Sequence, residues 1–126
     1  MTDPYPQLLV ERIGDVTVVT LKPDDFFDQQ MIALAKRELL DLVKAEQPAK
    51  LILSLHNVRR FSSAFIGVLV GLKEHLRFHH PDAEMKLADV RAAHREVFHL
   101  VDPNQSLFKL YEGVRQAYRS FEVGAA

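Results

Sequence analysis

The chain has 126 residues, of which 48% are hydrophobic and 26% charged, and its 16 Lys and Arg nearly balance its 17 Asp and Glu. This composition is typical of a single globular domain and excludes a disordered chain, and the near-neutral charge argues against a nucleic-acid partner. The sequence contains no cysteine, no signal-peptide pattern and no apolar run near the ~18 residues that span a membrane. We therefore expect a cytoplasmic protein with no membrane association.

The first part of the chain predicts a short tail followed by a β-hairpin. Residues 1–7 contain two prolines and little apolar character, which indicates a flexible N-terminal tail, and we place the single domain at residues 8–123. The apolar runs 8–13 and 16–21 are joined by a Gly-Asp pair, which is a turn signal between two strands.

The middle of the chain predicts two helices with a strand between them. Apolar positions recur at helical spacing over residues 29–46, after Asp28 as a candidate cap, which predicts a helix with one buried face. Residues 50–55 are short, apolar and bounded by breakers, which predicts a strand buried on both faces. The second helix is predicted from Ser63 to about His79, and its apolar first half indicates that this end lies deep in the molecule. We expect the most buried residues to include Leu51, Ile52, Leu53, Val68 and Leu69.

The last part of the chain continues the alternation of strands and helices. We predict a strand at residues 85–88, a helix at 91–100, an edge strand at 107–111 and a closing helix at 112–121. The positions expected to face inward on the helix at 91–100 are Ala93, Val97 and Leu100. This order predicts an α/β fold, with a mixed and mostly parallel sheet of about five strands and about four helices.

Two adjacent serines lie where the strand at 50–55 passes, through a polar turn, into the second helix. The first N–H groups of a helix have no intrahelical partner, and serine is one of the residues that cap them best. The same N–H groups and the positive end of the helix dipole also favour a phosphate. Ser62 and Ser63 are therefore candidates for a cap, an anion ligand or a phosphorylation site, and these alternatives stay open at this point.

This strand, loop and double serine resemble the Asp-Ser-Ser-Gly-Leu-Gly signature of the STAS domain family, the domain of bacterial anti-sigma-factor antagonists. The resemblance extends over residues 16–121. When Gly67 is placed on the last glycine of the signature, Ser63 falls on its phosphorylatable serine and Ser62 on its aspartate. The departures from the family pattern are Ser62 in place of the acid, Phe65 in place of a glycine, and Ser54 at a strand end that is often acidic.

The resemblance implies a STAS-like fold and a non-enzymatic regulatory module of signal transduction and transcription regulation. In such a partner-switching pathway the antagonist binds an anti-sigma factor or a related serine kinase, and a phosphatase is a further implied partner. Ser63 is the implied phosphorylation site, with Ser62 as the alternative. We expect the partner to contact Arg59, Arg60, Phe61, Ser62, Ser63 and Phe65.

Other functions stay open beside this interpretation. A STAS domain without phosphorylation would act as a scaffold or a transport-complex subunit, and a small-molecule sensor or hydrolase is a further alternative. The chain has no Gly-x-Ser-x-Gly elbow, no P-loop and no dinucleotide-binding glycine pattern, so we predict neither enzymatic activity nor a cofactor. Core filling is the expected role of Phe61 and Phe65, although an exposed ring at either position would suit an interface.

Two groups of side chains have a composition that suits a metal. His75 and His79 lie four residues apart on one helix, but the His-Glu-x-x-His pattern is absent. Asp24, Asp25 and Asp28 cluster before the first helix, where capping and the helix dipole account for them. We therefore predict no metal site.

Overall fold

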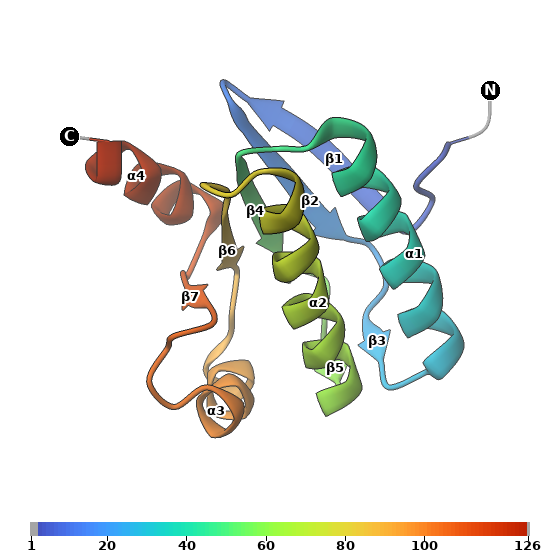
Figure 1. Ribbon diagram of the computed structural model, residues 1–126. Coiled ribbons are helices and arrows are strands. Elements are labelled where there is room, and N and C mark those ends of the chain that lie inside the picture. The colour runs from blue at the N-terminus through green and yellow to red at the C-terminus, as the bar shows by residue number, and fades with distance from the viewer. Residues whose placement is uncertain (1–2, 126) are drawn as a thin grey trace.

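A five-stranded mixed sheet forms the centre of the computed structural model, which describes residues 3–125 (Figure 1). Its strands, in spatial order, are β1 (Leu8–Ile13), β2 (Val16–Leu21), β4 (Lys50–Ser54), β6 (Glu84–Ala88) and β7 (Lys109–Leu110). β1 and β2 pair antiparallel, and all later neighbours pair parallel. The mixed, mostly parallel sheet predicted from the sequence is confirmed.

The two faces of the sheet are covered unequally. α1 (Gln29–Glu46) and α2 (Ser63–His79) lie side by side on one face, whereas α4 (Val114–Ala125) packs on the other face against β4 and β6. α3 (Ala92–Val101) follows β6 and lies beyond the carboxyl ends of the parallel strands (Figure 1). Within the described residues, none of the helices combines the length and the apolar character that crossing a membrane requires.

β4 is buried from both sides, as its apolar sequence predicts. Leu51 and Leu53 point into the main core beneath α1 and α2, whereas Ile52 points into the smaller core beneath α4, and all three are inaccessible to solvent. Leu69 of α2 is equally inaccessible. The prediction for Val68 is wrong, because this residue is only half-buried and lines a groove between α1 and α2 instead of facing the sheet.

The prediction for the buried face of α3 is also wrong. The three positions expected to face inward are exposed or only half-buried: Ala93, Val97 and Leu100. His94 and Phe98 are buried instead, because their rings pack against Phe61, at 4.9 and 5.4 Å between ring centroids. His94 Nε2 also lies 3.0 Å from the Arg59 carbonyl oxygen. A polar and aromatic face thus replaces the aliphatic face that we expected.

Two further strands form a small ladder outside the main sheet that no sequence pattern predicts. β3 (Asp25–Phe26) and β5 (Arg60–Phe61) pair in parallel. Each is two residues long, which is too short to carry a hydrophobic period. The ladder joins the segment before α1 to the segment before α2, and so it fixes the region that contains the two serines.

The segment before β1 is attached to the domain from Tyr5 onward. Tyr5 packs against the main core, and its carbonyl oxygen accepts a hydrogen bond from Leu8 N–H at 3.0 Å. Gln7 N–H donates to the Glu38 carboxylate on α1 at 2.8 Å. Residues 1–2 of the predicted tail lie outside the described residues. Within residues 3–7, contacts with the domain begin at Tyr5.

Candidate functional site

The segment that carries the two serines, residues 59–63, is bound through its main chain to the segment before α1. Arg59 N–H and Arg60 N–H both donate to the Asp24 carbonyl oxygen, at 2.7 and 3.1 Å, and Ser62 N–H donates to the Phe26 carbonyl oxygen at 3.3 Å. We call residues 59–63 the serine segment. Because these bonds use only backbone atoms, they hold the serine segment largely independently of its side chains.

Ser62 and Ser63 have different environments. Ser62 is the N-cap residue of α2 by its extended backbone, but its hydroxyl caps no N–H group and instead donates to the Phe26 carbonyl oxygen at 3.3 Å. Ser63 is the first helical residue and is exposed, and its hydroxyl has no hydrogen-bond partner among the described side chains and backbone. Phe65 N–H donates to the Ser62 carbonyl oxygen at 3.1 Å, so the N–H groups of Ser63 and Ala64, with the positive end of the helix dipole, stay open beside the Ser63 hydroxyl.

Neither of the two phenylalanines expected at the partner surface lies on the surface. Phe65 is inaccessible to solvent and stacks on Phe26 at 4.5 Å between centroids, and Phe61 is buried at 5.7 Å from Phe65. Both rings fill the core beneath the serine segment, so a partner would contact this segment without them. The exposed ring at this end is Phe27, and the Arg60 guanidinium lies over it at 4.7 Å from the centroid. The Phe-Phe pair at 26–27, with one ring buried and one exposed, is the signal that the sequence analysis missed.

Positive side chains lie within the serine segment and near it. Arg59 and Arg60 are exposed, and Arg91, before α3, donates from its guanidinium to the His56 carbonyl oxygen at 3.1 Å. Arg60 and Asp25 form a loose, largely exposed ion pair, with 3.9 Å between Nε and Oδ2. Such guanidinium groups favour a phosphate or a carboxylate on a partner.

The acidic cluster before α1 has structural roles. Asp28 caps α1, as expected, because its Oδ1 accepts a hydrogen bond from Gln30 N–H at 2.8 Å. The Asp25 carboxylate accepts a hydrogen bond from the N–H group two residues further along the chain at 2.9 Å.

On α2, the Nε2 atoms of His75 and His79 lie 3.3 Å apart. Among residues 3–125, no group of three His, Cys, Asp or Glu side chains is arranged to hold a metal.

A groove between α1 and α2 begins close to Ser63 and was not predicted. Its volume is about 370 Å³, and a Cβ atom added at Gly67 or Gly71 would meet nothing within 4 Å, so small residues leave it open. Its lining includes Ala64, Gly67, Val68 and Gly71 from α2 and Lys36 and Leu40 from α1. The small residues at 64, 67 and 71, which share one face of a helix, are the sequence signal that could have identified the groove.

At the end of β4, the Ser54 side chain is hydrogen-bonded to Asp89, which follows the neighbouring strand β6. The Ser54 hydroxyl donates to the Asp89 carboxylate, which follows β6, and it accepts a hydrogen bond from His56 N–H at 3.2 Å. Asp89 adopts a left-handed backbone with φ of 59°. The Asp89 carboxylate, directly after the neighbouring strand β6, thus bonds the Ser54 side chain at the end of β4, where the turn toward the serine segment begins.

Comparison with known proteins agrees with this architecture. The sequence matches the STAS domain family over residues 7–117, and no curated protein sequence matches it significantly. A protein from Thermotoga maritima, itself only a candidate anti-sigma factor antagonist, has a similar structure, with 18% identity, coverage of 94% of this chain and 97% of that chain, and a TM-score of 0.77. An anti-sigma factor antagonist from Mycobacterium paratuberculosis is similar with 23% identity, coverage of 91% and 92%, and a TM-score of 0.75.

A further similar structure is that of the anti-sigma factor antagonist SpoIIAA in its unphosphorylated form. Its identity is 13%, the coverage is 93% of this chain and 98% of that chain, and the TM-score is 0.65. At these sequence identities, the similarity to solved structures shows a shared fold. The match to the STAS family model extends over most of the chain and shows the family. The chain belongs to the STAS domain family.

Proposed function

We propose that this STAS domain is a non-enzymatic interaction module that antagonises an anti-sigma factor, and that phosphorylation of Ser63 controls the interaction. The observation that carries the proposal is the exposed Ser63 hydroxyl at the open N-terminal end of α2. Family membership supports the class of function, because similar structures with this fold are named as anti-sigma factor antagonists.

The partner surface in this proposal combines the serine segment with the groove between α1 and α2. The serine segment supplies the hydroxyl and guanidinium groups, and the groove supplies a depression of mixed polar and apolar lining beside them. The exposed ring of Phe27 and the guanidinium of Arg60 lie at the margin, and aromatic and Arg side chains are enriched among the residues that contribute most to binding. The buried rings of Phe61 and Phe65 support this surface from beneath.

A phosphate on Ser63 would leave the domain folded and oppose the partner. It adds a charge of about −1.5 to −2, and a helix N-terminus stabilises a negative charge by about 0.3–1 kcal/mol. A partner seated on the same surface would have to bury this charge, and each loss of about 1.4 kcal/mol lowers affinity about tenfold. One modification would therefore separate a binding state from a released state without unfolding.

Phosphorylation of Ser63 would be catalysed by a partner protein in the cytoplasm. The chain has no P-loop and no other nucleotide-binding pattern, so it has no evident means of binding ATP itself. An anti-sigma factor with serine kinase activity, or a related serine kinase, would transfer the γ-phosphoryl group of ATP to the Ser63 hydroxyl and release ADP, and a phosphatase would hydrolyse the phosphoserine.

Ser63 is preferred over Ser62 on geometric grounds. The Ser62 hydroxyl is half-buried and bonded to the Phe26 carbonyl oxygen, so a kinase acting on it would have to break that bond and pull the side chain outward. The alternative function, a scaffold or transport-complex subunit without phosphorylation, would leave both serines unmodified.

The test is phosphorylation by serine kinases encoded next to the gene, followed by affinity measurement. Wild type, Ser62→Ala and Ser63→Ala are incubated with kinase and ATP, and the modified residue is located by mass spectrometry. We expect Ser63→Ala alone to lose the phosphate. Ser63→Asp should keep the wild-type melting temperature and bind the anti-sigma factor about tenfold more weakly. Wild-type affinity in Ser63→Asp, together with an unmodified wild type, would favour the scaffold function.

A further inference from the structure

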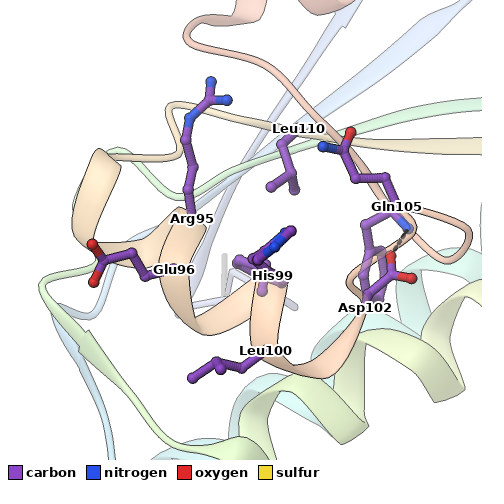
Figure 2. Close-up of a pocket in the computed structure, with 9 residues that line it drawn as sticks. Arg95, Glu96, His99, Leu100, Asp102, Gln105 and Leu110 are labelled. Atoms are coloured by element: carbon purple, nitrogen blue, oxygen red, sulfur yellow. Dashed lines mark hydrogen bonds between the residues drawn. The ribbon is translucent and has the colours of Figure 1, made fainter.

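A second region, between α3 and β7, has the form of a ligand site. A cavity of about 550 Å³ lies between α3 and the residues that lead into β7 (Figure 2). We propose that this cavity binds a small organic anion with an aromatic body. Its volume lies within the roughly 300–1,000 Å³ of small-molecule sites. It shares no lining residue with the groove between α1 and α2, and the inference goes beyond the function proposed above.

The floor of the cavity is apolar and fixed by packing. Phe98 and Phe108 are each 2% exposed, and their rings meet edge to face, with 5.8 Å between centroids and 75° between planes. Phe98 is held from behind by Phe61, at 5.4 Å between centroids, and Leu110 of β7 completes the apolar lining. Because the rings are already immobilised in the main core, the cavity does not have to be formed by its ligand.

The wall opposite α3 is the loop of residues 102–108, which a buried carboxylate holds in shape. Asp102 Oδ1 accepts hydrogen bonds from Ser106 N–H and its hydroxyl at 2.9 and 3.0 Å, and Oδ2 accepts from Leu107 N–H and Phe108 N–H at 2.9 and 3.1 Å. Burial alone would raise the pKa of Asp102, but these hydrogen bonds outweigh it and hold the pKa below its usual value. The carboxylate is therefore charged and already satisfied, so it shapes the cavity without offering a cation site.

Arg95 supplies the charge that selects the ligand. Its Nε donates a long hydrogen bond of 3.4 Å to the Val90 carbonyl oxygen, and within the described residues its guanidinium pairs with no carboxylate. Figure 2 shows Arg95 and Gln105 on opposite sides of the cavity, and Glu96, which also belongs to its lining, lies beside Arg95 on α3. The lining thus combines a guanidinium that pairs with no carboxylate of the described residues, the Glu96 carboxylate at the edge, and the Asp102 carboxylate, which is already hydrogen-bonded.

This combination specifies the class of ligand. The exposed Leu100 and half-buried Leu110 side chains, above the buried rings of the floor, accept a flat apolar ring. A guanidinium binds a carboxylate through two parallel, charge-assisted hydrogen bonds. The Gln105 amide and the His99 imidazole add further hydrogen-bonding groups at the rim. A compact aromatic carboxylate satisfies both the floor and the rim, whereas an organic cation would meet the charge of Arg95.

The experiment uses two probes of the same shape, 1-naphthylacetate and the neutral 1-naphthylacetamide. Each is titrated into the full ¹⁵N-labelled chain at neutral pH, and backbone amide shifts are followed by NMR. We expect both probes to shift amides within residues 95–110, with the acid bound about tenfold more tightly than the amide. Arg95→Gln should abolish this preference while the amide still binds, and Leu110→Trp, which fills the cavity, should block both probes.

Arg37→Gln is the matched control, because it removes an exposed arginine charge on α1, outside the lining of the cavity, and should leave the tenfold ratio unchanged. Dispersed spectra and thermal melts establish that each variant is folded, and if Leu110→Trp does not fold, Arg95→Gln decides the outcome. Four results would overturn the proposal: no binding of either probe, shifts centred outside residues 95–110, equal affinities for acid and amide, or a preference that survives Arg95→Gln.

Discussion

The serine segment and the 102–108 loop both border the main core, but different atoms hold them in place. In the serine segment the bonds run from backbone N–H groups to backbone carbonyl oxygens, and buried aromatic rings lie beneath. In the 102–108 loop most of the bonds end on the Asp102 carboxylate, and Lys73 Nζ donates another to the Leu107 carbonyl oxygen. The first arrangement keeps its shape when surface side chains change, whereas the second depends on one or two side chains.

Phe65→Ala should have the largest effect, because it removes the ring beneath the serine segment. This ring is inaccessible and lies between Phe26 and Phe61, so its loss should lower the free energy of unfolding by about 3–5 kcal/mol in urea melts. Leu69→Ala, one turn further along α2, is the matched control at about 2–5 kcal/mol. Only Phe65→Ala should also speed amide exchange in the serine segment. Equal exchange in both variants would show that the aromatic rings do not support this segment.

Asp102→Asn should have an intermediate effect confined to the 102–108 loop. An amide cannot replace a carboxylate that accepts hydrogen bonds at both oxygens, since its NH₂ group would face N–H donors, and we expect a loss of about 1–3 kcal/mol. Asp82→Asn, at an exposed turn position, is the control and should stay within about 0.5 kcal/mol. Amide spectra should change in the loop and not in the serine segment. Changes of similar size in both would erase the contrast between them.

Acidification should weaken the 102–108 loop selectively. The pKa of Asp102 is lower in the folded protein than its ordinary value of about 3.9. A lowered folded-state pKa stabilises the folded form above the ordinary value, and this stabilisation is lost as the pH falls through it toward the folded-state pKa. In urea melts, wild type should therefore lose its advantage over Asp102→Asn between about pH 5 and pH 3. A difference that stays constant over this range would exclude the carboxylate as the group that holds the loop.

The serine hydroxyls should contribute least to stability, because neither caps α2. Ser62→Ala and Ser63→Ala should each change the free energy of unfolding by about 0.5 kcal/mol or less. Asp28→Ala, which removes the side-chain cap of α1, is the positive control and should cost about 1 kcal/mol. A loss near that of Asp28→Ala in the Ser63→Ala variant would assign the Ser63 hydroxyl to the cap and would weaken the case for a switch.

Long periodic segments of this fold are predictable, and short ones are not. The bounds of β1, β2 and α1 agree with the predicted ranges residue for residue, because six or more residues of regular hydrophobicity specify an element and its ends. β3 and β5 carry no period in two residues each. The inward face of α3 was misassigned because only its aliphatic positions were counted, although a buried His94 with a carbonyl partner and Phe98 occupy it.

The candidate site is predictable only as far as its local sequence reaches. The exposure of Ser63 follows from its place in the first turn of a helix. The inward turn of the Ser62 hydroxyl depends on Phe26, which lies 36 positions earlier in the chain. The groove depends on how α1 meets α2, and the cavity depends on how α3 meets the approach to β7. These features come from contacts between distant segments, so a local pattern does not reveal them.

The strands of the main sheet are arranged in space in the same order in which they occur along the chain. Each new strand therefore pairs with one that precedes it, and no strand has to be inserted between two that are already bonded. The sheet can grow in one direction from the β1–β2 hairpin, whose short loop closes most readily. Because a chain leaves the ribosome N-terminus first, the backbone ladder of the serine segment can form before α3 and β7 have been synthesised. The packing of Phe61 against His94 and Phe98 then follows with α3.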